Sequence, residues 1–356
     1  MISKSPFNIV QQRLGTYEGQ PVFQFKLENG AMSVELINIG CIITSIMVPD
    51  RSGKMGNVVA GFENWEQYLD PHPYFGCIVG RFANRIANGI FNLEGKRFQL
   101  SDNDPPNHLH GGVKGFDKKI WQVKEVIEKN DCVGVSLSYI SIDGEEGYPG
   151  TLETTVTYLL ETDNKLYIEC TATTDKTTII NLTNHSYFNL TAFETATIYK
   201  HHLQIAAKNI LAKSDQQTPT GKRIDIINSS FDFTKDKEIG EYISSIPGEL
   251  GYDHSYVLDE HETETMPVAI LSDPESGRQL SVFTNQPSIH CYTANWWDGT
   301  LLGSQGKNYL RHGAIALEAQ AFPDAPNHPQ FPTTILRPDE VYRAYTVYQF
   351  GLTKHA

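Results

Sequence analysis

Short runs in which apolar and small residues alternate occur through most of this chain, and they constrain its fold more than any other feature. In one of them, Val133, Val135, Leu137 and Tyr139 alternate with Gly134 and two serines. Because successive side chains of a strand point to opposite faces, a period of two indicates β-strands. Turn-forming Gly, Pro, Asn and Asp separate the runs, which is typical of antiparallel sheets. Further runs of strand character lie at residues 31–48, 151–160, 166–174, 280–284, 314–319 and 341–350.

Helical patterns are few. Residues 62–69 could form one short helix capped by Asn64. Long amphipathic helices that alternate with strands are missing, which argues against a doubly wound α/β fold. We find no linker, repeat or low-complexity segment, and the apolar content of 40% is enough for a large core. We therefore expect an all-β fold, a single large antiparallel β-sandwich domain spanning residues 1–356.

Charge and cysteine content narrow the class of function. The formal net charge of −13 argues against nucleic acid and anionic membranes as partners, and it fits a neutral substrate. The chain has five cysteines, an odd number, and no two of them form a CxxC motif. We therefore expect free thiols and a cytoplasmic protein. No stretch is long enough to span a membrane, and no apolar signal core follows the first residues.

A polar segment, NLTNHSYFNL at residues 181–190, interrupts two strand-like runs and has His185 at its centre. Its asparagines, Ser186 and Tyr187 supply many hydrogen-bonding groups, each of which needs a partner if it is buried. One interpretation is a polar turn between strands. The other is that neighbouring amides hold His185 in one tautomer, so that it can exchange a proton.

Two earlier segments also concentrate polar groups. Arg81 and Arg85 lie in an otherwise small and apolar run, and each could fork onto a carboxylate or sugar hydroxyls or make a surface ion pair. His108 and His110 would share a face if they lie on a strand, as in some metal sites. A carboxylate should then follow within a few residues; since Lys114 and a glycine follow instead, we expect no metal.

Two carboxylates stand out in the second half of the chain. Asp253 lies between aromatic residues, where it could accept hydrogen bonds from sugar hydroxyls or cap a turn. Glu318 ends an apolar run, and alternation places it on the same face as Ala314 and Ala316. That face leaves room for a ligand, and burial would make the carboxylate a stronger base. The alternative is a strand-end glutamate paired with an arginine.

Eight motifs of the chain, in the order in which they occur, together resemble the aldose 1-epimerase (galactose mutarotase) family. Motifs typical of nucleotide-binding proteins, zinc proteases and serine hydrolases are missing. The resemblance covers nearly the whole chain and implies a large antiparallel β-sandwich with a sugar site on a concave sheet face. The motifs are GRFANRIANG (80–89), LHGG (109–112), GEEGYPG (144–150), NLTNHSYFNL (181–190), GYDHSYVL (251–258), YTAN (292–295), LEAQAFPDAPN (317–327) and LRPDE (336–340).

The resemblance also implies roles for individual residues. Glu318 matches the general base that takes the proton of the anomeric hydroxyl, and His185 matches the general acid that protonates the ring oxygen. The remaining matches are substrate-binding residues, among which His290 stands where some members have glutamine. These substrate-binding residues are Asn84, Arg85, His110, Tyr187, Asp253 and His290.

The implied reaction is the interconversion of α and β anomers of a free aldohexose such as galactose or glucose. The base removes the C1 hydroxyl proton, the bond from C1 to the ring oxygen breaks, and the open aldehyde recloses on its other face. A carboxylate and an imidazolium suit this chemistry near neutral pH, and no cofactor is needed. We expect a small sugar as partner and a monomer or weak homodimer. The alternatives are a non-catalytic carbohydrate-binding protein, a glycoside hydrolase using Asp253 and Glu318, and a hexose-phosphate epimerase.

Overall fold

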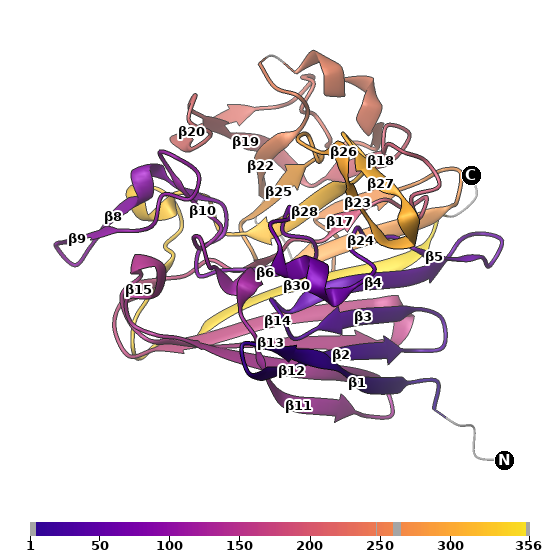
Figure 1. Cartoon of the computed structure of the whole chain (residues 1–356). Helices are drawn as coiled ribbons and strands as arrows, with labels where there is room; N and C mark the ends of the chain where they lie inside the picture. Colours follow the sequence, from indigo (N-terminus) through magenta and orange to yellow (C-terminus); the bar gives the residue numbers. More distant parts are fainter. Residues whose placement is uncertain (1–4, 247, 259–264, 354–356) are drawn as a thin grey trace.

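Antiparallel sheets dominate the computed structural model, which describes residues 5–246, 248–258 and 265–353 (Figure 1). All pairs between its named strands are antiparallel. The largest sheet has nine strands and includes five of the seven runs expected from the sequence. In order across the sheet these are β11 (Gln122–Glu128), β12 (Cys132–Ser141), β13 (Leu152–Glu161), β14 (Lys165–Thr174), β30 (Tyr342–Leu352), β24 (Arg278–Thr284), β23 (Ala269–Ser272), β18 (His202–Ile205) and β21 (Lys237–Glu238).

Two further sheets complete the main architecture. One has five strands in sequence order, β1 (Asn8–Tyr17), β2 (Gln20–Glu28), β3 (Ser33–Ile37), β4 (Ile42–Pro49) and β5 (Met55–Asn57). The other has six strands, in the order β17 (Tyr187–Phe188), β28 (Ile315–Gln320), β25 (Ser288–Tyr292), β22 (Asp253–Leu258), β19 (Ala207–Lys213) and β20 (Pro219–Asp225).

One hydrophobic core joins the three sheets. Its largest cluster contains Phe25 of β2, Val135 of β12 and Leu317 of β28, all of them buried. Strands β1–β4 overlie β11–β14 in Figure 1, and the six-stranded sheet occupies the opposite half of the molecule. The alternation read from the sequence agrees with this packing, because β13 and β14 expose every second side chain more than its neighbours. The expected antiparallel β architecture is confirmed.

Helical structure is limited to single turns of 3₁₀ type in the described residues. The helix expected at residues 62–69 is the 3₁₀ helix η1 (Trp65–Leu69), with Asn64 as its N-cap. The backbone N–H of Asn64 donates to Oε1 of Gln67 at 3.0 Å, which closes the first turn. The others are η2 (Ala87–Gly89), η3 (Phe116–Lys118), η4 (Glu145–Gly147), η5 (Thr162–Asn164), η6 (Ile239–Glu241), η7 (Ile243–Ser245), η8 (Ser304–Gly306) and η9 (Ala325–Asn327).

Short two-stranded ribbons connect the large sheets and carry several of the sequence motifs. Two of these ribbons lie beside the six-stranded sheet and place the 80–89, 107–112 and 181–190 segments near it. The ribbons are β7 (Arg85–Ile86) with β10 (His108–Leu109), β6 (Ile78–Val79) with β16 (Thr183–Asn184), β8 (Ile90–Leu93) with β9 (Lys96–Gln99), β15 (Thr178–Ile179) with β29 (Ile335–Leu336), and β26 (Asp298–Leu302) with β27 (Asn308–Leu310).

The five cysteines are free and buried, as expected from their number and spacing. Burial raises the pKa of the Cys41 and Cys77 thiols, so these thiols are weak nucleophiles. Among the described residues, helices never reach the length and apolarity that a membrane span requires.

Arg81 is a structural residue, neither a sugar ligand nor a surface ion pair. Its side chain is buried, and Nη1 and Nη2 donate to the backbone carbonyls of Gly150 at 2.8 Å and Ser141 at 3.1 Å, among others. The guanidinium thus binds the loop between β12 and β13 to the segment that carries Asn84 and Arg85. Several diverging acceptors suit the planar fork of arginine.

Arg81→Lys should therefore lower the free energy of unfolding by about 2–3 kcal/mol, because an ammonium group cannot reach all of these carbonyls and each one left unpaired is costly. Urea denaturation would measure the loss. Arg97→Lys is the matched control, since Arg97 is exposed on β9. Equal stability of the two variants would contradict this role of Arg81.

Candidate active site

One small cavity of about 180 Å³ gathers all eight site residues expected from the sequence. Its volume suits a single small molecule, since pockets for drug-sized ligands usually occupy about 300–1,000 Å³. The cavity is lined by Pro73, Tyr74, Asn84, Arg85, Leu109, His110, His185, Tyr187, Asp253, His290, Tyr292, Trp296 and Glu318.

The floor of the cavity is one face of the six-stranded sheet. Glu318 of β28 lies directly opposite His290 of β25, and His290 lies opposite Ser255 of β22. Directly paired residues of antiparallel strands project to the same face, so these three side chains form a polar row across the sheet. Ala316 is on the same face of β28 as Glu318 and pairs with Tyr187. Its small side chain leaves space above the sheet, as the alternation in the sequence suggested.

His185 is held by its backbone. Its N–H donates to the carbonyl of Cys77 at 2.9 Å, and its carbonyl accepts from the N–H of Gly76 at 3.0 Å. Asn184 reinforces this connection, since its side-chain amide donates to the carbonyl of Gly76 at 2.9 Å. The amides of the segment were expected to fix the imidazole tautomer. Their NH₂ groups donate to main-chain carbonyls instead, and Nδ1 of His185 has no hydrogen-bond partner among the described residues.

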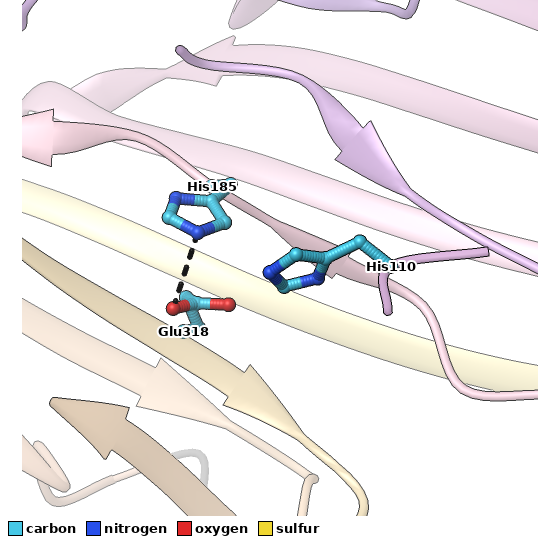
Figure 2. A group of neighbouring side chains, drawn as sticks. All are labelled: His110, His185 and Glu318. Carbon is cyan, nitrogen blue, oxygen red and sulfur yellow. Dashed lines mark ion pairs between the residues drawn. The ribbon is translucent and has the colours of Figure 1, made fainter. Parts of the chain in front are cut away.

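His185 and Glu318 form a buried pair at the centre of the cavity. Nε2 of His185 lies 3.4 Å from Oε1 of Glu318, and the two side chains are 4% and 2% exposed (Figure 2). Oε2 of Glu318 is buried, and no described residue forms a hydrogen bond with it. It lies on the side of the carboxylate that faces His110 in Figure 2. A polar atom left unpaired in this way is free to bind a substrate hydroxyl.

Burial opposes charge on both members of the pair. It lowers the pKa of His185 to about 3 and, together with the nearby charge of Asp253, raises the pKa of Glu318 well above its ordinary value. The imidazole of His185 is therefore neutral near pH 7, in contrast to the imidazolium expected from the sequence, because the depth of burial cannot be read from the motif. Both shifts favour uncharged forms, a protonated carboxyl group and an unprotonated imidazole, so burial favours one proton shared by the pair.

His110 and Asn84 position each other. The backbone N–H of Asn84 donates to Nδ1 of His110 at 3.2 Å, and the N–H of His110 donates to the carbonyl of Asn84 at 3.0 Å. Both residues have positive φ, 62° and 49° respectively, a conformation that costs energy and occurs often at functional sites. Nδ1 accepts a hydrogen bond and burial lowers the pKa of His110, so Nε2 carries the proton. Figure 2 shows this Nε2 directed toward His185 and Glu318.

The turn after His110 requires a glycine. Gly111 has a φ of 87°, and a Cβ at this position would lie 1.8 Å from the carbonyl oxygen of Gly80. Close approach of these two backbone segments joins the 80–89 and 107–112 motifs. It also separates the two histidines that were expected to share a face: strand β10 ends at Leu109, so His110 turns into the cavity.

His108 points away from the cavity. It is buried between Ser101 and Tyr148, with Nδ1 2.7 Å from the carbonyl oxygen of Ser101 and Nε2 2.7 Å from the hydroxyl of Tyr148. Both of its nitrogens thus have partners outside the site. His108 is a structural histidine that connects two loops.

His110, His185 and Glu318 have the composition of a metal site, and their candidate ligand atoms all lie within 4.8 Å of one another. A metal would need a lone pair from each imidazole. The N–H of Asn84 occupies Nδ1 of His110, which leaves a proton on the nitrogen that faces the cluster. This tautomer fits a hydrogen-bond donor to a ligand oxygen and does not fit a metal ligand.

Two further charged side chains reach the cavity, each paired with a neighbour. Nε of Arg85 donates to Oδ2 of Asp104 at 2.7 Å, and Nε2 of His290 lies 2.8 Å from Oδ1 of Asp253. Burial alone would raise the pKa of Asp253, but the hydrogen bond from His290 and the charges of His290, Lys213 and Arg85 lower it well below its usual range. Asp253 is therefore an anion throughout the neutral range.

Two aromatic residues of the cavity escaped the sequence analysis. The ring of Tyr74 lies over both histidines, with centroids 4.5 Å from His110 and 6.0 Å from His185. The indole of Trp296 lines the cavity although it is 74% exposed, so it stands at the mouth. Aromatic faces of this kind pack well against the C–H face of a sugar ring. The only local signal for Tyr74 was its place in the stretch PHPYFG, which contains two prolines and a glycine, whereas Trp296 directly follows the YTAN motif.

Comparisons with known proteins identify the family of the chain. The profile of the Aldose 1-epimerase family matches residues 24–349. The chain is 42% identical to rat galactose mutarotase over 94% of its own length and 95% of the relative. It is 36% identical to the aldose 1-epimerase of Escherichia coli K12, over 94% of this chain and 96% of that one. A crystal structure of galactose 1-epimerase from Lactobacillus acidophilus superposes with a TM-score of 0.86 at 28% identity, covering 98% of this chain and all of that one. The chain belongs to the aldose 1-epimerase family.

Proposed function

We propose that the chain interconverts the α and β anomers of free aldohexoses, with galactose and glucose as substrates. The observation that carries this proposal is the buried pair of Glu318 and His185, which holds one proton at the floor of a cavity sized for one small molecule. The names of the relatives, galactose mutarotase and aldose 1-epimerase, support the same reaction. The free thiols support a reducing, cytoplasmic location, and we propose a monomer or weak homodimer.

In the proposed reaction, Glu318 takes the proton of the anomeric hydroxyl as the C1–O5 bond breaks. The electron pair of the O–H bond becomes the second bond of the aldehyde, and the electrons of the broken bond go to O5. His185 gives its proton to O5, so that the pair still holds one proton after ring opening. Rotation about C1–C2 then turns the other face of the aldehyde to the C5 hydroxyl, and reclosure reverses both proton transfers.

The single proton of the pair fits this cycle. The proposed step requires Glu318 as a carboxylate and His185 as an imidazolium when the closed sugar is bound. Nε2 of His185 and Oε1 of Glu318 are 3.4 Å apart, so the proton can reach His185 from Glu318 with a small approach of the two groups. Arg85 lowers the pKa of Glu318 and so favours its carboxylate form.

The remaining residues would bind and orient the sugar. Nε2–H of His110 and the guanidinium of Arg85 supply donors, and Asp253 supplies an anionic acceptor for ring hydroxyls. Asn84 and Tyr187 line the same cavity. Arg85 is the single arginine or lysine among the described residues of its wall, and Asp104 neutralises it. A hexose phosphate is therefore a poor fit.

Polarimetry of freshly dissolved α-D-galactose and α-D-glucose tests the proposal. The enzyme should accelerate decay to the same final rotation that is reached without it. A folded sample that accelerates neither sugar would reject the proposal, and release of nitrophenol from an aryl galactoside would favour a glycoside hydrolase instead.

The kcat of the enzyme should change less than about twofold between pH 7 and pH 5 after subtraction of the spontaneous rate. The imidazole of His185 stays neutral over this range, because its protonation requires a pH near its pKa of about 3. A histidine with the ordinary pKa of 6.5 would place an inflection inside the tested range. A tenfold fall of kcat over this range would contradict the assignment.

A further inference from the structure

Both ring nitrogens of His290 have partners within the protein. Nε2 lies 2.8 Å from Oδ1 of Asp253, and Nδ1 lies 2.8 Å from the hydroxyl oxygen of Ser255. The imidazole is buried, with its side chain 7% exposed. Three neighbouring side chains on one sheet face thus form a continuous hydrogen-bonded series, from Ser255 through His290 to Asp253.

Because both ring nitrogens of His290 already have hydrogen-bond partners, neither is available to a ligand. Nε2 must carry a proton to bind the anionic carboxylate, and the hydroxyl group of Ser255 already engages Nδ1. In contrast, Oδ2 of Asp253 has no hydrogen-bond partner among the described residues, and the side chain, which lines the cavity, is 17% exposed. A sugar hydroxyl can therefore reach the aspartate and cannot bind the imidazole without breaking a bond that already exists.

We propose that His290 is a positioning residue that acts through Asp253, and not a sugar contact. The inference rests on the proposed function. An aspartate side chain rotates about two bonds, and the N–H of His290 selects the orientation in which Oδ2 faces the cavity. Ser255 in turn keeps the imidazole in the tautomer that donates to Asp253. The rest of Asp253 is already fixed, because Nζ of Lys213 donates to its backbone carbonyl at 2.7 Å.

The proposal separates binding from chemistry. Asp253, held in place by His290, binds the sugar, whereas Glu318 and His185 move the protons. Loss of the His290 N–H should therefore raise KM more than it lowers kcat. A glutamine at this position carries an amide N–H that can also donate to Asp253, and so it should preserve the function of the series.

A double-mutant cycle tests this directly, with kcat/KM for galactose measured by polarimetry. His290→Phe should reduce kcat/KM by about tenfold or more, mostly through KM, and Asp253→Asn should reduce it by at least as much. If His290 acts through Asp253, adding His290→Phe to Asp253→Asn should cause less than about a twofold further loss. If the losses in kcat/KM of the two single variants multiply in the double variant, His290 contacts the sugar directly and the inference is wrong.

His290→Gln guards against a variant that fails to fold. It should stay within about threefold of the parent in KM, and thermal denaturation should show intact structure in every variant used. A glutamine variant that is folded and as impaired as His290→Phe would also overturn the inference. The parent protein distinguishes this outcome from failure of the proposed function: if it does not accelerate mutarotation, the proposed activity itself is wrong.

Discussion

Glu318→Gln should reduce kcat by about 10³-fold or more while KM stays within a few-fold of the parent value. The amide has nearly the shape of the carboxylate and still fills the space below His185, so the sugar should bind as before. It cannot take the proton of the anomeric hydroxyl. A general base typically contributes about 10²–10⁴-fold, and a loss of 10³-fold corresponds to about 4 kcal/mol in the barrier.

This variant should also be at least as stable as the parent at pH 8. The pKa of Glu318 is raised in the folded protein by burial. The folded state therefore binds this proton more tightly than the unfolded state, and the glutamate weakens folding increasingly as the pH rises above 4.5, its ordinary pKa. Glutamine carries no charge and removes this penalty. A lower melting temperature at pH 8 would contradict the electrostatic account.

Polarimetry with galactose gives kcat and KM, and thermal denaturation gives stability. Glu153→Gln is the matched control, because Glu153 is exposed on β13 and should leave both quantities unchanged. Near-normal turnover of folded Glu318→Gln would remove Glu318 from the mechanism.

The sequence predicted the β architecture because each strand carries its own pattern of apolar and polar residues. In β13 and β14 the period of two follows from which side chains meet the core, and this pattern is visible without a partner strand. Glu318 could be placed on an open face for the same reason, since the alternation of residues 314–319 puts the small side chains of Ala314 and Ala316 on its side. Most of the expected site residues lie in the motifs that carry the resemblance to the aldose 1-epimerase family, whereas Tyr74 and Trp296 lie outside these motifs.

Features that depend on the register between strands or on how deeply a side chain is buried could not be predicted from local patterns. The contact of His290 with Asp253 and Ser255 depends on how β22 and β25 align, and a shift of one residue would turn these side chains to the opposite face. Asp104 reaches Arg85 from a separate loop. Similarly, the neutral state of His185 follows from its distance to solvent, which a motif does not encode.

The turn at Gly111 and Gly112 combines a feature that the sequence predicts with one that it does not. Two adjacent glycines, such as those at 111–112, are typical of a sharp turn or of a close approach between backbone segments. The structure identifies the approaching group as the carbonyl of Gly80, and this contact brings Asn84 into hydrogen-bonding distance of His110. The turn type was local information, whereas the partner segment was not.

His185→Asn should lower kcat by about 10²–10³-fold, because O5 would then leave as an alkoxide or take its proton from water. The amide of asparagine is smaller than imidazole and cannot exchange a proton near neutral pH. KM should change less than kcat, since Arg85, His110 and Asp253 keep their positions. Polarimetry measures both constants. His202→Asn is the control, since His202 pairs with Asp236 away from the cavity.

The strongest form of this test combines the two variants. In the proposed mechanism Glu318 and His185 share one proton, so neither can contribute to catalysis without the other. When residues act as a unit in this way, the losses caused by their single substitutions do not multiply in the double variant. The double variant should therefore be no more than about tenfold slower than the slower single variant. If the two losses multiply, the residues act independently, and the shared-proton mechanism would have to be replaced by one in which each group exchanges its proton with water.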